Sequence, residues 1–186
     1  LVNDLLDISR IEAGRYEITL EPLALAGLVA ECLDSVRPQA SARHVTLATA
    51  IALELPDIVA DRRAVRQMLL NLLSNAVKFN RDGGKVVVVA EVTGDGVALA
   101  VTDTGIGISE AEIGRLGNPF VQADRGLSRR YEGAGLGLSI VMGLVRMHGG
   151  EVEIDSRLGE GTTVRILFSQ TAPAGEDAPE PFLTSE

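Results

Sequence analysis

The stretch Val97-Ala-Leu-Ala-Val-Thr-Asp-Thr-Gly-Ile-Gly-Ile108 joins an apolar run of strand type to a lone carboxylate, Asp103, and two glycines, Gly105 and Gly107. Carboxylates are rarely buried unless something pairs with them. Glycine lets backbone approach a ligand closely where any Cβ would clash. The combination indicates a binding site at the end of a buried strand, and not packing alone.

A second glycine-rich turn, Gly133-Ala-Gly-Leu-Gly137, leads directly into the helical pattern of residues 138–147. Free N–H groups at a helix start, together with the positive end of the helix dipole, form an anion site. The pair of turns therefore indicates a nucleotide, with an acceptor for the base and N–H groups for phosphates. Either turn alone is weak evidence, because a glycine-rich turn is more often only a turn.

Composition restricts the partners and the compartment. The 186 residues are 46% hydrophobic, which suits the core of one domain with appendages. A net charge of −9 argues against nucleic acid or an anionic membrane as a general partner. The single cysteine, Cys32, excludes an internal disulfide and fits a reduced, cytoplasmic setting.

The chain begins inside a helical pattern, and we interpret it as a fragment of a longer protein. No window approaches a membrane-spanning length and no signal peptide opens the chain, which leaves open a membrane anchor elsewhere in the full-length protein. Residues 1–14 form an apolar stripe at helical spacing. This helix either completes a bundle or coiled coil whose remainder is missing, or packs on its own domain.

We expect residues 15–169 to form the main domain and residues 170–186, rich in Pro, Ala, Glu and Asp, to be a disordered tail. Asp61 is a good helix N-cap, and Gly94-Asp95-Gly96 is a strong hairpin signal. Little periodicity marks residues 117–132, which we interpret as a long loop or lid. Periodicity predicts strands at 16–20, 45–51, 58–60, 85–92, 97–103, 151–156 and 163–168, and helices at 25–43, 62–79, 110–116 and 138–148.

Helix 62–79 contains two asparagines in a leucine-rich setting, although Asn is a poor helix former. Asn71 and Asn75 are spaced i, i+4 and Lys78 follows at i+7, so all three share one face. An amide oxygen can ligate Mg²⁺, and an ammonium can meet phosphate as a point charge. The alternative is a solvated face with two incidental asparagines.

With these residues placed, the chain resembles the catalytic, ATP-binding domain of two-component sensor histidine kinases over about residues 58–168. The segment 1–14 resembles the end of the second helix of the dimerisation and phosphoacceptor domain. The resemblance implies an α/β two-layer sandwich of the Bergerat type, with a mixed sheet covered by helices on one face, which agrees with the predicted elements. It rests on an N box at 71–79, a G1 box at 103–107, an F box near Pro119-Phe120 and a G2 box at 133–137.

The resemblance also implies roles for matching residues. Asp103 accepts a hydrogen bond from the adenine amino group, and Phe79 helps to form the base pocket. Asn75 ligates Mg²⁺ with Asn71 close by, and Lys78 approaches phosphate. Arg129 or Arg130 reaches the γ-phosphate, and the pattern does not choose between them. The remaining implied positions, around the lid, the phosphates and the adenine, are Gly105, Gly107, Gly133, Gly135, Gly137, Leu138 and Thr162.

The implied function is transfer of the γ-phosphoryl of Mg²⁺-ATP to a histidine on an adjacent helical domain. The partners implied are that domain, a downstream response regulator and a second copy in a full-length homodimer. Related ATPases of the gyrase, chaperone and mismatch-repair class place a glutamate at position 71 to activate water. Asn71 cannot take a proton, whereas a neutral imidazole needs mainly positioning and charge neutralisation to attack phosphorus.

Two features depart from the family pattern. Gly117 replaces the usual aromatic at the start of the F box, where Phe120 is kept. Neither His44 nor His148 lies in a helical bundle pattern, so we expect a structural role or an interaction with a helix C-terminal dipole for both, and an acceptor upstream of Leu1. The fragment alone is then inactive. The alternative is a pseudokinase-like module that binds nucleotide or a partner without productive transfer.

Overall fold

The strand that ends in Asp103 is the central strand of a five-stranded sheet, in a computed structural model that describes residues 2–94, 96–113 and 135–169. The strands follow the order β2-β4-β5-β7-β6. β2 runs parallel to β4, and the other neighbouring pairs are antiparallel, so the sheet is mixed as expected. Its strands are β2 (Thr46–Ile51), β4 (Lys85–Thr93), β5 (Gly96–Asp103), β6 (Glu151–Arg157) and β7 (Gly161–Ser169).

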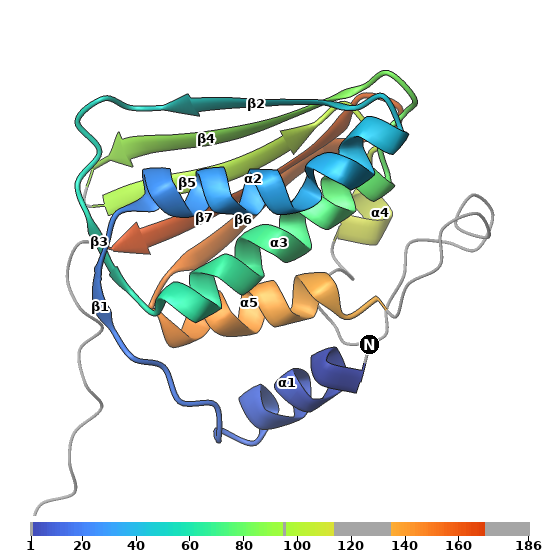
Figure 1. Ribbon diagram of the computed structural model, residues 1–186. Helices are drawn as coiled ribbons and strands as arrows, with labels where there is room; N and C mark the ends of the chain where they lie inside the picture. Colours follow the sequence, from blue (N-terminus) through green and yellow to red (C-terminus); the bar gives the residue numbers. More distant parts are fainter. Residues whose placement is uncertain (1, 95, 114–134, 170–186) are drawn as a thin grey trace, which may run out of the picture.

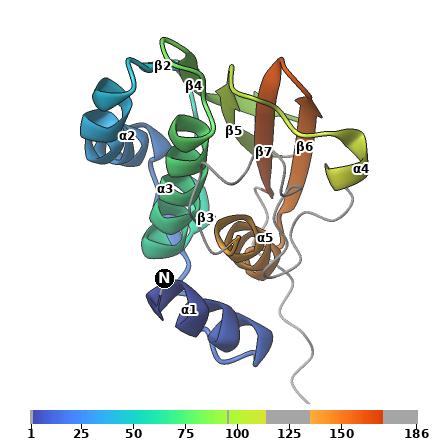
Figure 2. The same cartoon turned by 90° about the vertical axis from the view of Figure 1, so that its right-hand side faces the viewer.

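Three helices cover one face of this sheet (Figure 1, Figure 2). They are α2 (Leu25–Ala42), α3 (Arg62–Lys78) and α5 (Gly137–Met147), and a short helix α4 (Glu110–Ile113) follows β5. The apolar face of each helix packs on the apolar face of the strands, and the largest fully buried side chains come from both layers. The α/β two-layer sandwich is therefore confirmed. Those side chains include Leu28, Met68, Leu69, Leu73, Leu99, Ile140, Leu144 and Ile166.

The local signals in the sequence explain most element boundaries. The Asp61 side chain caps α3, because its Oδ1 accepts the backbone N–H groups of Arg63 at 2.8 Å and Ala64 at 3.0 Å. Thr93 pairs with Gly96 across the predicted hairpin, and Gly149 ends α5 with a φ of 65°. Gly96 to Val101 are all buried, as the apolar run at the start of β5 predicts.

The prediction of a strand at residues 16–20 is wrong, because that segment has no regular structure. The strand begins later, as β1 (Glu21–Leu23), which pairs antiparallel with β3 (Ile58–Ala60) in a separate two-stranded sheet. The physical reason is a side-chain interaction. The Thr19 N–H donates to Asp61 Oδ2 at 2.8 Å, so this part of the chain is held by a carboxylate and not by a neighbouring strand.

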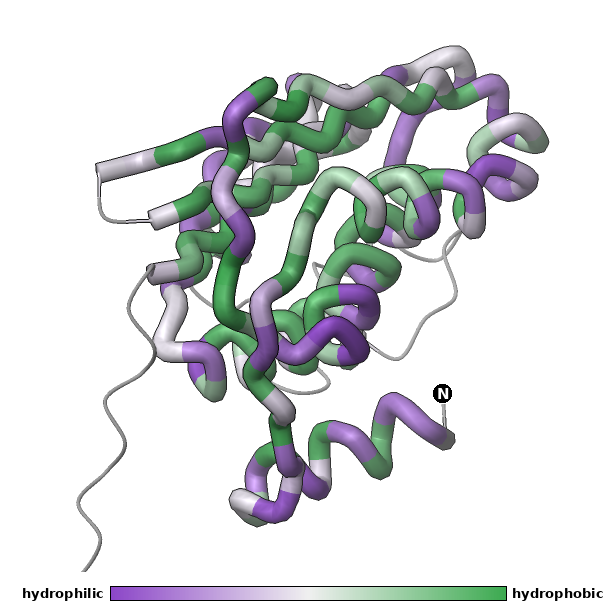
Figure 3. The backbone as a smooth tube through the Cα atoms, turned by 60° about the vertical axis from the view of Figure 1, so that its left-hand side comes forward, coloured by the Kyte–Doolittle hydropathy of each residue, from purple (hydrophilic) through white to green (hydrophobic). Residues whose placement is uncertain are grey.

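The first helix, α1 (Val2–Glu12), packs on the domain that follows it. Ile8 is buried, and Ile11 Cγ2 lies 2.8 Å from where a Cβ on Gly143 of α5 would stand. On α3, Gln67 Nε2 donates to Asp7 Oδ2 at 2.8 Å. Of the two expected arrangements, the structure therefore has α1 packed on its own domain. Hydrophobic and hydrophilic residues alternate along this helix (Figure 3), and a second set of apolar side chains, Leu5 and Leu6, remains 49% exposed.

Several sequence predictions fall outside the described residues. These are the loop at 117–132 with its F box residue Phe120, Arg129 and Arg130, the first G2 glycine Gly133, the last part of the helix predicted at 110–116, and the tail at 170–186.

Within the described part of the chain, none of the helices has the length and apolar character that crossing a membrane requires.

Candidate functional site

Asp103 lies at the end of β5, directly opposite Thr162 on β7. Its carboxylate is half-buried and accepts two backbone hydrogen bonds. One comes from the Gly105 N–H, at 2.7 Å from Oδ1, and the other from the Thr162 N–H. Burial raises the pKa of Asp103, and the two N–H donors act in the opposite direction. A carboxylate has about four lone-pair directions, so it retains acceptor capacity for a ligand.

The two glycines that follow Asp103 are required by neighbouring backbone. A Cβ on Gly105 would overlap the Phe79 carbonyl oxygen and would stand 2.7 Å from Asp103 Oδ1. Gly107 has a φ of 66°, and a Cβ there would overlap the Arg157 carbonyl oxygen. We expected these glycines to make room for a ligand. In the described residues their immediate effect is to let the turn after β5 pack tightly on the end of α3 and on the β6–β7 turn.

The asparagines of α3, which belong to the N box, meet the start of α5, where the G2 box ends. Asn71 Nδ2 donates to the Gly137 carbonyl oxygen at 3.4 Å. A Cβ on Gly137 would stand 3.5 Å from Asn75 Nδ2, which is ordinary contact. Both asparagines are half-buried. Among the described residues, no side chain caps the N-terminus of α5 at Leu136.

The end of α3 connects these residues to Asp103. Lys78 Nζ lies 5.0 Å from the centroid of the Phe79 ring, within cation–π range. The Phe79 carbonyl oxygen accepts the Ile106 N–H at 3.1 Å and so binds the turn after β5 to the N box. The structure thus has two contact groups on one scaffold. The first is Asp103, Gly105, Phe79 and Thr162, and the second is Asn71, Asn75 and Gly137 with its neighbours Gly135 and Leu138.

Sequence reasoning missed a polar cluster behind Asp103. Asn80 is 1% exposed, and its Nδ2 donates to the Lys85 carbonyl oxygen at 3.1 Å. Its Oδ1 accepts the Arg81 N–H at 3.0 Å and the Thr104 hydroxyl at 3.3 Å. These bonds fix the chain between α3 and β4 against the turn after β5. A polar residue between Phe79 and the Gly83-Gly84 turn was the available signal.

The two histidines have different environments. His148 is buried, its Nδ1 donates to the Leu144 carbonyl oxygen at 2.7 Å, and its Nε2 accepts the Asp61 N–H at 3.0 Å. The structural role expected for His148 is therefore confirmed. His44 is exposed, adopts a φ of 53°, and pairs with Asp82 Oδ1 at 2.9 Å.

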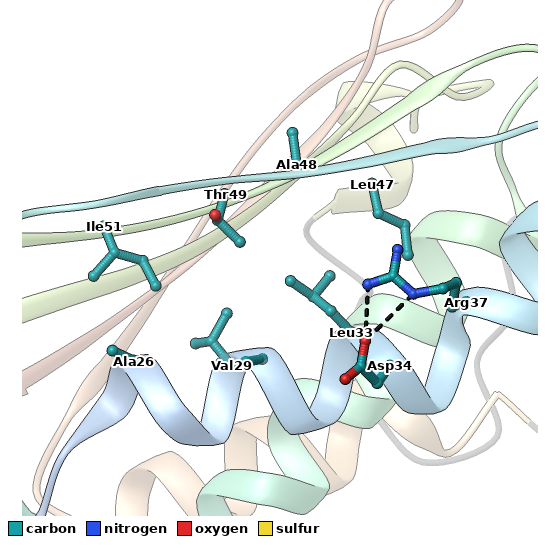
Figure 4. Close-up of a pocket in the computed structure, with 10 residues that line it drawn as sticks. Ala26, Val29, Leu33, Asp34, Arg37, Leu47, Ala48, Thr49 and Ile51 are labelled. Carbon is teal, nitrogen blue, oxygen red and sulfur yellow. Dashed lines mark hydrogen bonds and ion pairs between the residues drawn. The ribbon is translucent and has the colours of Figure 1, made fainter.

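A separate hollow of about 390 Å³ lies between α2 and β2 (Figure 4). Ala26, Val29 and Leu33 on α2 face Leu47 and Ile51 on β2 across it. Its charged lining residues pair with each other, because an Arg37 nitrogen donates to Asp34 Oδ1 at 2.8 Å. It shares no lining residue with the groups around Asp103 and Asn71, so it is not part of the candidate site.

The mixed sheet, the carboxylate at the end of β5 and the paired N box and G2 box define an ATP-binding class of protein. The chain belongs to the histidine kinase-, DNA gyrase B-, and HSP90-like ATPase family, whose pattern matches residues 60–172. Within that family it is a catalytic domain of the sensor histidine kinase type.

The curated relatives are longer proteins. An uncharacterized sensor-like histidine kinase of Rhizobium meliloti is 46% identical over 172 residues, which cover 92% of this chain and 33% of the relative. The non-motile and phage-resistance protein of Caulobacter vibrioides is 45% identical, with 90% of this chain and 20% of the relative covered. This chain therefore spans a third or less of the length of these relatives.

Solved structures agree with the fold. Full-length ShkA in complex with AMPPNP superposes with a TM-score of 0.81 at 35% identity, over 93% of this chain and 35% of ShkA. The nucleotide-free catalytic domain of the histidine kinase ThkA gives a TM-score of 0.72 at 22% identity, over 84% of this chain and all of that one, which supports the fold alone.

Proposed function

We propose that this chain binds Mg²⁺-ATP, with the adenine on Asp103, and donates the γ-phosphoryl group to a histidine on a helical domain outside the described residues. The observation that carries the proposal is the Asp103 carboxylate. It is half-buried, its pKa is raised by burial, and the Gly105 and Thr162 N–H groups hold it in place at the end of a central strand. A carboxyl group in such a setting is a candidate for ligand recognition.

Adenine suits this acceptor better than guanine. An ionised carboxylate only accepts hydrogen bonds, and adenine presents an amino donor where guanine presents a carbonyl oxygen. A site that depends on such a bond rejects the mismatched base, because buried polar groups are then left unpaired. The AMPPNP in the ShkA complex, an ATP analogue on a relative with 35% identity, supports the choice of nucleotide.

The residues of α3 and α5 suit a magnesium triphosphate. No group of three or more His, Cys, Asp or Glu in the described residues could hold a metal. A hard cation would therefore rely on the Asn75 amide oxygen, with phosphate oxygens and water as its other ligands. When bound, Mg²⁺ would neutralise charge on the phosphates. Asn71 would keep the turn at Gly137 in place, the N-terminus of α5 would bind phosphate oxygens, and Lys78 would add a positive charge.

Phosphoryl transfer, and not hydrolysis, is the reaction that these residues favour. Asn71 offers an amide to the Gly137 carbonyl and has no basic atom with which to activate water. His148 is buried and hydrogen-bonded through both ring nitrogens, and His44 lies in a turn and not on a helix, so neither matches an acceptor on a helical domain. We therefore propose that the acceptor histidine lies on a dimerisation domain upstream of α1. A cytoplasmic homodimer that passes the phosphoryl group to a response regulator completes the proposal, and the relatives named as histidine kinases support it.

Calorimetry with ATP and GTP in the presence of Mg²⁺ tests the proposal. We expect ATP to bind at least about tenfold more tightly than GTP, and Asp103→Ala to abolish that preference. Asn75→Ala should remove the dependence of ATP binding on Mg²⁺. With radioactive ATP the chain alone should not label itself, whereas an added helical domain that carries the acceptor should gain acid-labile phosphate. Equal affinities for ATP and GTP, or label on His44 or His148, would show that the assignment is wrong.

A further inference from the structure

Arg81 connects two turns that are distant in sequence and that both support Asp103. Its Nη2 donates to the Gly105 carbonyl oxygen at 3.3 Å, in the turn after β5. The same nitrogen donates to the Gly159 carbonyl oxygen, in the turn between β6 and β7. The first turn provides the Gly105 N–H to Asp103, and the second leads within three residues to the Thr162 N–H.

We propose that Arg81 is a positioning residue for base recognition, which acts by holding the two N–H donors of Asp103 in register. This inference rests on the proposed adenine-binding role of Asp103. Arg81 acts through these two backbone carbonyl groups, so the proposed role needs no contact between Arg81 and nucleotide. Its effect is transmitted through Gly105 and Gly159, because the carbonyl oxygens of both accept hydrogen bonds from the same Arg81 nitrogen.

The backbone of Arg81 is itself fixed, so the side chain extends from a rigid base. Its N–H donates to the buried Asn80 Oδ1 at 3.0 Å, and its carbonyl oxygen accepts the Gly84 N–H at 3.1 Å. Asn80 is in turn bonded to Thr104, the residue after Asp103. The loop from Phe79 to Gly84 therefore supports the turn that follows Asp103, and Arg81 is the residue of this loop that reaches the β6–β7 turn.

A second bond limits the expected effect. The Gly159 N–H also donates to the Ile106 carbonyl oxygen at 2.7 Å, so the two turns remain connected without Arg81. Removing Arg81 should loosen the donors of Asp103 without unfolding either turn. A single hydrogen bond of this kind contributes on the order of 1 kcal/mol, which corresponds to about a fivefold change in affinity.

The test is the ratio of ADP to GDP affinity, measured by competition in the presence of Mg²⁺. Arg81→Met keeps a long side chain and removes the donor, and it should lower this ratio about fivefold, mainly through weaker ADP binding. Arg81→Lys should restore much of the ratio, because both bonds come from one nitrogen that an ammonium can replace. Arg157→Ala is the matched control. It also removes one positive charge, at the last residue of β6 and next to the turn that Arg81 reaches, where the Arg157 guanidinium is exposed and 3.8 Å from Glu160.

An equal loss of ADP and GDP affinity in Arg81→Met, or the same loss in Arg157→Ala, would overturn the proposal, because a general loss of charge or stability acts on both nucleotides alike. An unchanged ratio would also overturn it. Amide chemical shifts of Gly105 and Thr162 in the nucleotide-free chain give a second measurement, and both should move in Arg81→Met and stay in Arg157→Ala. If the unsubstituted chain does not prefer ADP over GDP while these amides do move, the proposed function fails and Arg81 holds the turns for another reason.

Discussion

Removing the Asp61 carboxylate should destabilise the fold at the point where the segment after α1 meets α3. Asp61 is 2% exposed, and three backbone N–H groups donate to it, those of Arg63 and Ala64 to Oδ1 and that of Thr19 to Oδ2. Loss of a helix N-cap costs about 1–2 kcal/mol. Loss of the Thr19 bond adds about 0.5–1 kcal/mol, because Thr19 is exposed and water can replace the carboxylate there.

Asp61→Ala should therefore lower the free energy of unfolding by about 1.5–3 kcal/mol, measured by urea denaturation. Hydrogen exchange at the Thr19 amide should become faster in the same variant. Arg63→Ala is the control, because its guanidinium is 3.4 Å from Asp61 Oδ2 and its side chain is 79% exposed. That change should cost less than about 0.5 kcal/mol.

The pH dependence of this stabilisation has a definite sign. The pKa of Asp61 is lowered from its ordinary value of 3.8, because the hydrogen bonds of Thr19, Ala64 and Arg63 outweigh the opposing effect of burial. The charged form is thus favoured by folding. Its contribution is fully present above the unfolded pKa and is lost as the pH falls through the lower folded pKa. The stability difference between the unsubstituted chain and Asp61→Asn should be constant near neutrality and shrink below pH 3.8.

A change in the free energy of unfolding of less than about 0.5 kcal/mol in Asp61→Ala, or an equal cost in Arg63→Ala, would refute the reasoning.

Two further predictions concern Asp103 and α1. Burial raises the pKa of Asp103, and adenine needs the ionised carboxylate, so the affinity for ADP should fall with decreasing pH from a point above 3.8. In calorimetry, Asp103→Asn should bind ADP more weakly and with an affinity that depends less on pH. The same fall in affinity at acid pH in both proteins would assign the effect to another group. In Gly143→Ala the new Cβ would meet the Ile11 side chain, so hydrogen exchange of residues 2–12 should become faster. Residues 137–147 should stay protected, because alanine favours helix. The double variant Ile11→Ala/Gly143→Ala should restore the slow exchange, and failure to do so would mean that this contact does not hold α1.

The sequence was sufficient for the elements whose signals are local. Alternation and apolar runs predicted β4, β5 and β7, because side chains on a strand point alternately to two faces. The i, i+4 spacing of Asn71 and Asn75 predicted a shared face on α3, and Asp61 marked the start of that helix. The order of the glycine-rich boxes predicted the family, which the match over residues 60–172 confirms. The roles of the individual site residues remain predictions.

Only the tertiary structure decided how those elements are joined to one another. The bonds that do this join Thr19 to Asp61, Asp61 to His148, and Arg81 to Gly159, which are 42, 87 and 78 residues apart in sequence. Periodicity reports the environment of a residue relative to its near neighbours and contains no information about partners at such separations. That is why a strand was expected where Thr19 binds a carboxylate, why the backbone contacts of Gly105 and Gly107 were not foreseen, and why the polar character of Asn80 and Arg81 did not reveal their place beside the turn after β5.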